Sequence, residues 1–146
     1  MRLSLDLSLP TDMSLLATTR RALRSYLLDF GASVEVSDDV ILAVDEACAN
    51  VLQHAYPGGG VEENFRLHVE LQDDGILIEV LDDGVGFDGF GYLAGHRRPE
   101  DFEEPALSGR GLDVMRKLMT TVEVESPTPT GGTRLRLIRH LVATGD

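Results

Sequence analysis

The sequence contains little cysteine, few basic residues and no long apolar run, and each shortage excludes a class of protein. Its single cysteine, Cys48, cannot form an internal disulfide, so nothing in the chain requires an oxidising compartment. Apolar runs of about 18 residues or more do not occur, which predicts no membrane-spanning helix and no membrane partner. The first residues lack the basic end and apolar block of a signal peptide. We therefore predict a cytoplasmic protein.

Basic residues are outnumbered by acidic ones, 13 against 25, which gives a formal net charge of −12. Such a surface repels nucleic-acid phosphates and favours basic partners, although acidity also serves solubility alone. We expect no direct contact with nucleic acid. The four histidines have no metal-site spacing and there is no cysteine pair, so a structural zinc site is not expected.

Alternating and helical patterns succeed one another along the chain. Alternation of apolar residues predicts strands over residues 2–9 and 64–72, with a hairpin turn at 73–75 and a returning strand over 75–81. Helical spacing predicts a first helix that ends at Gly31, a second that Ser37 caps and that runs to about Ala55, and a third that opens at Gly109. Two final strands flank a turn at 126–132.

These elements predict one α+β domain over residues 1–146. We expect a two-layer α/β sandwich, with a mixed, mostly antiparallel sheet and helices on one face. The stretch of about residues 88–108 has no convincing period. A loop of this length in a small domain is usually a functional lid or disordered, and we interpret it as a lid.

The second predicted helix presents Glu46 and Asn50 together, because residues four apart share a helix side. The apolar stripe lies on another side, and the small residues Ala43 and Ala47 would leave room for a ligand. An amide oxygen suits Mg²⁺, and a carboxylate one turn away can accept a proton. From this helix alone, a solvated polar face is the commoner explanation.

Asp82 ends the strand over 75–81 on the same parity as its apolar residues, whereas Asp83 falls on the other parity. A buried carboxylate requires a donor, and the exocyclic amino group of a base would supply one. Gly84 and Gly86 permit close approach of the backbone to a ligand. The alternative for these glycines is an ordinary turn.

Two further glycine segments complete the pattern. Gly109-Arg110-Gly111-Leu112 opens the third predicted helix, where free N–H groups suit a phosphate. The alternative for this segment is a glycine hinge before a packing helix. Arg110 either contacts phosphate or is a surface charge. The second segment, Gly131-Gly132-Thr133, opens the last predicted strand. Thr133 shares parity with Leu135 and Leu137, so we expect its hydroxyl to point inward and to join Asp82 in holding the base; the alternative is an inward threonine that the backbone satisfies.

The four segments together resemble the N and G boxes of the GHKL ATPase superfamily, and most closely those of its single-domain anti-sigma-factor serine/threonine kinases. The resemblance covers about residues 8–140. It implies the GHKL fold, Glu46 as catalytic base, Asn50 as Mg²⁺ ligand and Asp82 as the adenine-binding acid. It also implies ATP-site roles for the segments named above, whose members are Gly84, Gly86, Gly109, Arg110, Gly111, Leu112 and Thr133.

The resemblance therefore predicts an ATP- and Mg²⁺-dependent protein serine/threonine kinase that acts as an anti-sigma factor. It would bind a sigma factor, phosphorylate a small STAS-type antagonist, and form a homodimer. One alternative is a nucleotide-dependent binding module without kinase activity. Another is a detached histidine-kinase-type ATPase domain, for which His54 is a poor phosphoacceptor. Arg97 and Arg98 in the lid receive no role.

Overall fold

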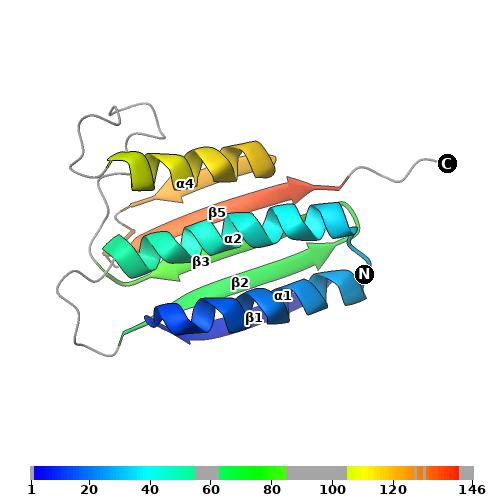
Figure 1. Ribbon diagram of the computed structural model, residues 1–146, viewed down its shortest axis with the longest axis horizontal. Coiled ribbons are helices and arrows are strands. Elements are labelled where there is room, and N and C mark those ends of the chain that lie inside the picture. The colour runs from blue at the N-terminus through cyan, green and yellow to red at the C-terminus, as the bar shows by residue number, and fades with distance from the viewer. Residues whose placement is uncertain (1, 55–62, 85–104, 127, 130, 142–146) are drawn as a thin grey trace.

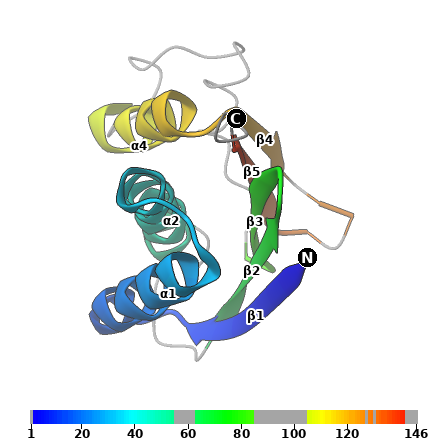
Figure 2. The same ribbon diagram turned by 90° about the vertical axis from the view of Figure 1, so that its right-hand side faces the viewer.

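The computed structural model describes residues 2–54, 63–84, 105–126, 128–129 and 131–141. It contains a sheet with helices packed on one face, which confirms the predicted two-layer α+β sandwich (Figures 1 and 2). The strands are Leu3–Pro10 (β1), Asn64–Gln72 (β2), Gly75–Asp82 (β3), Thr121–Glu125 (β4) and Thr133–His140 (β5). The helices are a short 3-10 turn at Met13–Leu15 (η1), Leu16–Phe30 (α1), Val34–His54 (α2) and Pro105–Leu118 (α4).

The five strands lie in the order β1-β2-β3-β5-β4. Every strand pair among the described residues is antiparallel. The prediction of a mostly antiparallel sheet is therefore confirmed, but its description as mixed is wrong. The hairpins β2–β3 and β4–β5 account for two of the four pairs, since a short turn can join only antiparallel neighbours. The pairing of β3 with β5 places Asp82 directly opposite Thr133.

The core lies between the sheet and the three long helices (Figure 2). In β2 and β3 the inward residues are buried, as the predicted alternation requires. Helix α2 lies between α1 and α4 and contacts both. Cys48 lies in this core, and burial raises the pKa of its thiol to about 12, so the thiol stays protonated near neutral pH and packs against its apolar neighbours.

Two predicted helix starts are wrong. Helix α2 begins at Val34, where the Ser33 hydroxyl accepts the N–H of Val36 at 3.1 Å; Ser37, the predicted cap, is fully buried within the helix. Helix α4 begins at Pro105, because proline is well suited to a first helical turn. Residues 105–108 are therefore helical and do not belong to a loop. The predicted stop at Gly31 is confirmed by its positive φ of 110°.

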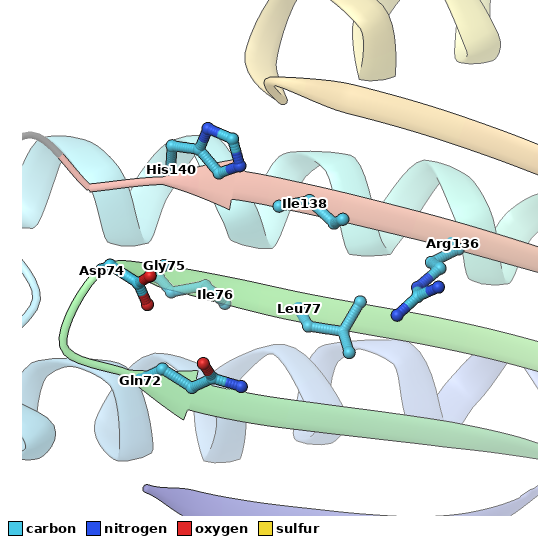
Figure 3. Close-up of a pocket in the computed structure, with 8 residues that line it drawn as sticks. All are labelled: Gln72, Asp74, Gly75, Ile76, Leu77, Arg136, Ile138 and His140. Carbon is cyan, nitrogen blue, oxygen red and sulfur yellow. The ribbon is translucent and has the colours of Figure 1, made fainter. Parts of the chain in front are cut away.

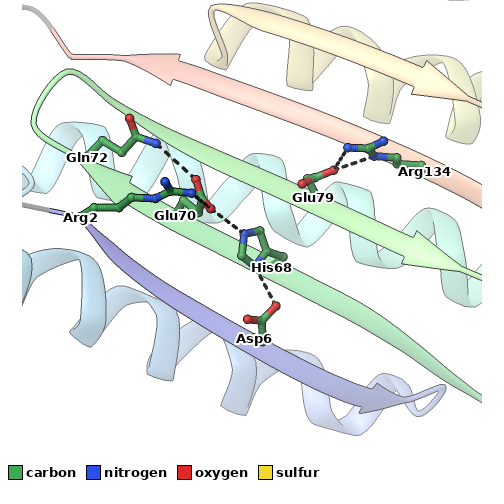
Figure 4. A network of polar contacts seen from close by, with 7 residues as sticks. All are labelled: Arg2, Asp6, His68, Glu70, Gln72, Glu79 and Arg134. Atoms are coloured by element: carbon green, nitrogen blue, oxygen red, sulfur yellow. Dashed lines mark hydrogen bonds and ion pairs between the residues drawn. The ribbon is translucent and has the colours of Figure 1, made fainter.

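The sheet face opposite the helices carries charged side chains (Figure 4). Glu70 accepts from Arg2 at 2.6 Å and lies 3.3 Å from His68, whose other ring nitrogen lies 2.7 Å from Asp6. Burial alone would lower the pKa of His68, but these two carboxylates raise it above its usual value.

None of the helices in the described ranges is long and apolar enough to cross a membrane.

Candidate nucleotide site

Glu46 and Asn50 meet helix α4 at Gly111. A Cβ added to Gly111 would lie 2.9 Å from Glu46 Oε2 and within 4 Å of both polar atoms of the Asn50 amide. The absent side chain of Gly111 therefore lets α4 lie close to the polar side of α2 without displacing the Glu46 carboxylate. The structure brings Gly111 of one predicted segment to Glu46 and Asn50 of another, although Gly111 lies inside α4 and not at its first turn.

Asn50 is buried at 5% exposure, and within the described part of the chain its amide nitrogen has no hydrogen-bond partner. A buried polar group without a partner costs about 1–3 kcal/mol, so such a group in a native fold requires an explanation. A bound ligand with oxygen atoms would supply that partner. Ser37 of α2 also has a buried oxygen without a partner among the described residues, so the amide nitrogen indicates a ligand only together with the nearby Glu46 carboxylate and the close approach of Gly111.

The donor set fits Mg²⁺ delivered with phosphates better than a metal held by protein alone. No group of three or more His, Cys, Asp or Glu side chains suited to a metal occurs among the described residues. Mg²⁺ commonly takes one or two protein oxygens and completes its shell with water and substrate phosphate oxygens. Asn50 could supply one such oxygen, with Glu46 close by.

Glu46 has the electrostatic setting of a proton acceptor. Partial burial raises the pKa of its carboxyl group, and the neighbouring Asp45 raises it further. A base with a raised pKa holds an abstracted proton more readily near neutral pH. Ala43 and Ala47, predicted to leave room for a ligand, are instead fully buried in the core, because α2 is packed on both flanks by α1 and α4.

Asp82 and Thr133 form the second part of the site, at the end of β3 and the start of β5. Both are buried, whereas Asp83 is exposed, which confirms the predicted inward placement of Asp82. Burial raises the pKa of Asp82, opposed by backbone N–H donors of Gly84 (3.0 Å) and Thr133. An ionised carboxylate has more acceptor sites than these donors use, so Asp82 can still accept from a ligand.

This part of the site also includes Gly132, which belongs to the same predicted segment as Thr133, and Ser126, for which the sequence indicated no role. A Cβ on Gly132 would overlap the Asp82 carbonyl oxygen, so only glycine lets β5 begin this close to the end of β3. The Ser126 hydroxyl lies 2.8 Å from that of Thr133. Continuing the β4–β5 register by one pair from Glu125 would have placed Ser126 opposite Thr133.

The segments that carry these residues lie at one end of the molecule (Figure 1). The C-terminal part of α2, the end of β3, the start of β5 and the beginning of α4 all lie there. Leu112 is buried in the core, and Gly109 and Arg110 lie in α4. Predicted Gly86, the lid with Arg97 and Arg98, and the glycines after Pro57 lie outside the described residues.

A hollow of about 210 Å³ lies elsewhere, at the opposite end and on the open face of the sheet (Figure 3). Its walls include Leu77 and Ile138, with Arg136 and His140 beside them. Gly75 pairs with His140 at one end of the β3–β5 ladder, beside the hollow, whereas Asp82 pairs with Thr133 at the other end. This hollow is therefore separate from the candidate nucleotide site.

The histidine kinase-like ATPase domain family model matches residues 9–139, and the chain belongs to that family. Membership in an ATPase family implies ATP binding. Among curated relatives, the serine-protein kinase RsbW of Halalkalibacterium halodurans is 28% identical over 128 residues, which cover 84% of this chain and 75% of the relative. The anti-sigma F factor of Clostridium acetobutylicum is 31% identical over 115 residues, 77% of this chain and 76% of the relative.

Solved structures share the fold at low sequence identity. The RsbU and RsbW domains of a Mycobacterium tuberculosis protein align with a TM-score of 0.67 and 20% identity, over 94% of this chain and 32% of that chain. In the SiaB–SiaC complex from Pseudomonas aeruginosa, the matching chain also gives a TM-score of 0.67, at 18% identity, over 92% of this chain and 88% of that chain. At these identities the likeness extends to the fold alone.

Proposed function

We propose that the protein is a Mg²⁺-dependent serine/threonine kinase that uses ATP and acts as an anti-sigma factor. The observation that carries the proposal is the close approach of Gly111 to Glu46 and Asn50. It gathers at one point a glycine of α4, a carboxylate and a buried amide whose nitrogen has no partner among the described residues. The curated relatives named as serine-protein kinase and anti-sigma factor support the same function.

Each residue has a distinct task in this proposal. Asn50 would hold Mg²⁺ through its amide oxygen, and the metal would neutralise charge on the transferred phosphate. Glu46 would accept the proton of the attacking serine or threonine hydroxyl, for which its raised pKa is suited. Asp82 and Thr133 would hold adenine, and Gly84, Gly86, Gly109, Arg110, Gly111 and Leu112 would shape the remainder of the pocket.

The proposed partners are a sigma factor and a STAS-type antagonist protein, in a cytoplasmic setting. Phosphorylation of the antagonist would release it and leave the kinase free to hold the sigma factor. We include a homodimer in the proposal. Strand β1 supports it, because its outer edge has no strand partner among the described residues.

The test is transfer of labelled γ-phosphate from ATP to a candidate antagonist. We expect transfer by the wild type with Mg²⁺, and a large loss in Glu46→Gln with ATP binding retained. Binding of ATP without any labelled protein would favour the alternative, a nucleotide-dependent binding module. Label that appears on a histidine of this chain, stable to base and labile to acid, would instead favour a detached histidine-kinase domain.

A further inference from the structure

Three side-chain oxygens form one row across the inner face at the end of the sheet. Asp82 on β3 lies opposite Thr133 on β5, and the Thr133 hydroxyl lies 2.8 Å from the hydroxyl of Ser126, which directly follows β4. The next inward pairs of the ladder are apolar, since Leu135 pairs with both Val80 and Val124. Val80 and Leu135 are buried in the core, so the row of oxygens marks where the apolar interior of the sheet ends and a polar edge begins. A flat ring bound at this end of the sheet would turn its polar edge toward that row.

Which of the two hydroxyls donates the hydrogen bond between them determines what such a ring would meet. A threonine hydroxyl has one proton to donate and lone pairs to accept. If Ser126 donates to Thr133, the Thr133 proton remains available to a ligand. If Thr133 donates to Ser126, the ligand meets lone pairs only, next to a carboxylate that also only accepts.

The two purines differ on the edge that this row would meet. Adenine presents an amino donor at position 6 beside the acceptor N1, whereas guanine presents the acceptor O6 beside an N1–H donor. Asp82 as acceptor and Thr133 as donor match adenine in both positions and oppose guanine in both. A carboxylate alone discriminates less, because it can accept from the N1–H and amino groups of guanine as well.

We propose that Ser126 is a positioning residue for base specificity, which donates to Thr133 and thereby directs the Thr133 proton toward N1 of adenine. This inference rests on the proposed nucleotide site and adds a residue to it. Ser126 does not touch the reacting phosphates, so its effect falls on nucleotide recognition and not on the transfer step.

The test measures equilibrium affinity by calorimetry, for ATP, GTP and 1-deaza-ATP, in which a C–H group replaces N1. The variants are Ser126→Ala, Ser126→Thr and the matched control Ser8→Ala, whose serine is exposed on β1. A neutral hydrogen bond is worth about 0.5–1.5 kcal/mol net, so Ser126→Ala should weaken ATP binding roughly two- to tenfold. Ser126→Thr should restore it, and Ser8→Ala should change nothing.

The analogue separates positioning from general damage. With 1-deaza-ATP, Ser126→Ala should bind as well as the wild type, because the contact to N1 is already missing; GTP affinity should not fall either. Equal losses for ATP and 1-deaza-ATP, or no loss for ATP, would overturn the inference while leaving the nucleotide site intact. Absence of ATP binding by the wild type would defeat the proposed function, and this inference with it.

Discussion

Gly111→Ala is the substitution for which the structure makes the sharpest prediction, because it separates stability from catalysis. The new Cβ would lie 2.9 Å from Glu46 Oε2, whereas ordinary contact begins at 3.4 Å, so the carboxylate must move by at least the difference, 0.5 Å. A carboxylate at the end of a flexible side chain can make that move at little cost. The overlap therefore falls on the position of the proposed base and not on the backbone.

The two effects have opposite signs. Replacing glycine by alanine inside a helix stabilises it by up to about 1 kcal/mol, so the free energy of unfolding should stay constant or rise. A displacement of about 1 Å in a catalytic group can cost roughly a hundredfold in rate, and half that distance corresponds to roughly tenfold. We expect Gly111→Ala to be at least as stable as the wild type and to transfer phosphate about ten times more slowly.

Urea unfolding and transfer of labelled phosphate to the antagonist measure the two quantities on the same preparation. Asp113→Ala is the matched control, because Asp113 is exposed on the same helix and lies outside the site. It should change helix stability without slowing transfer. The reasoning is refuted if Gly111→Ala transfers phosphate at the wild-type rate, or if it loses several kcal/mol of stability.

Further expectations concern the sheet and its connection to the helices. Gly132→Ala should destabilise the fold by several kcal/mol in urea unfolding, because its Cβ would overlap the Asp82 backbone; a soluble variant of wild-type stability would contradict the close approach. Asp82→Asn should raise the free energy of unfolding at neutral pH, since the raised pKa of Asp82 means that its charged form is disfavoured in the fold. The gain should shrink as the pH falls toward the ordinary value of 3.8, and a gain that is constant with pH would contradict it. Arg139→Ala should cost about 1–3 kcal/mol, because its guanidinium joins Asp39 of α2 at 2.8 Å to a carbonyl at the end of α4 at 2.6 Å. Arg20→Ala, which removes a more exposed ion pair, should cost less than about 1 kcal/mol, and equal losses would contradict the ranking.

The sequence by itself determined the strands and the inward placement of Asp82. Both follow from a period of two along the strand, which depends on local geometry only. The same local rule placed Thr133 correctly on the buried face. The glycine that ends α1 was also readable, because a left-handed residue at a helix end strongly favours glycine.

Helix starts were less well determined, because capping residues compete over a few positions. Ser33 and Ser37 are both suitable caps by residue type, and packing against the core decided between them. The GRGL segment resembles a helix start, yet α4 begins at Pro105 and carries Gly111 into its interior. There the glycine serves close helix packing, which a sequence pattern cannot distinguish from phosphate binding.

Only the tertiary structure decided which residues meet. Gly111 is 61 residues from Asn50 in the chain, and the two come within contact distance because α4 packs along α2. Asp82 and Thr133 become neighbours because β5 pairs with β3 as well as with β4, the strand that precedes it in the chain. The role of Ser126 likewise follows from strand register. Such contacts depend on how complete elements pack, and a single sequence records the period of each element but not its neighbour.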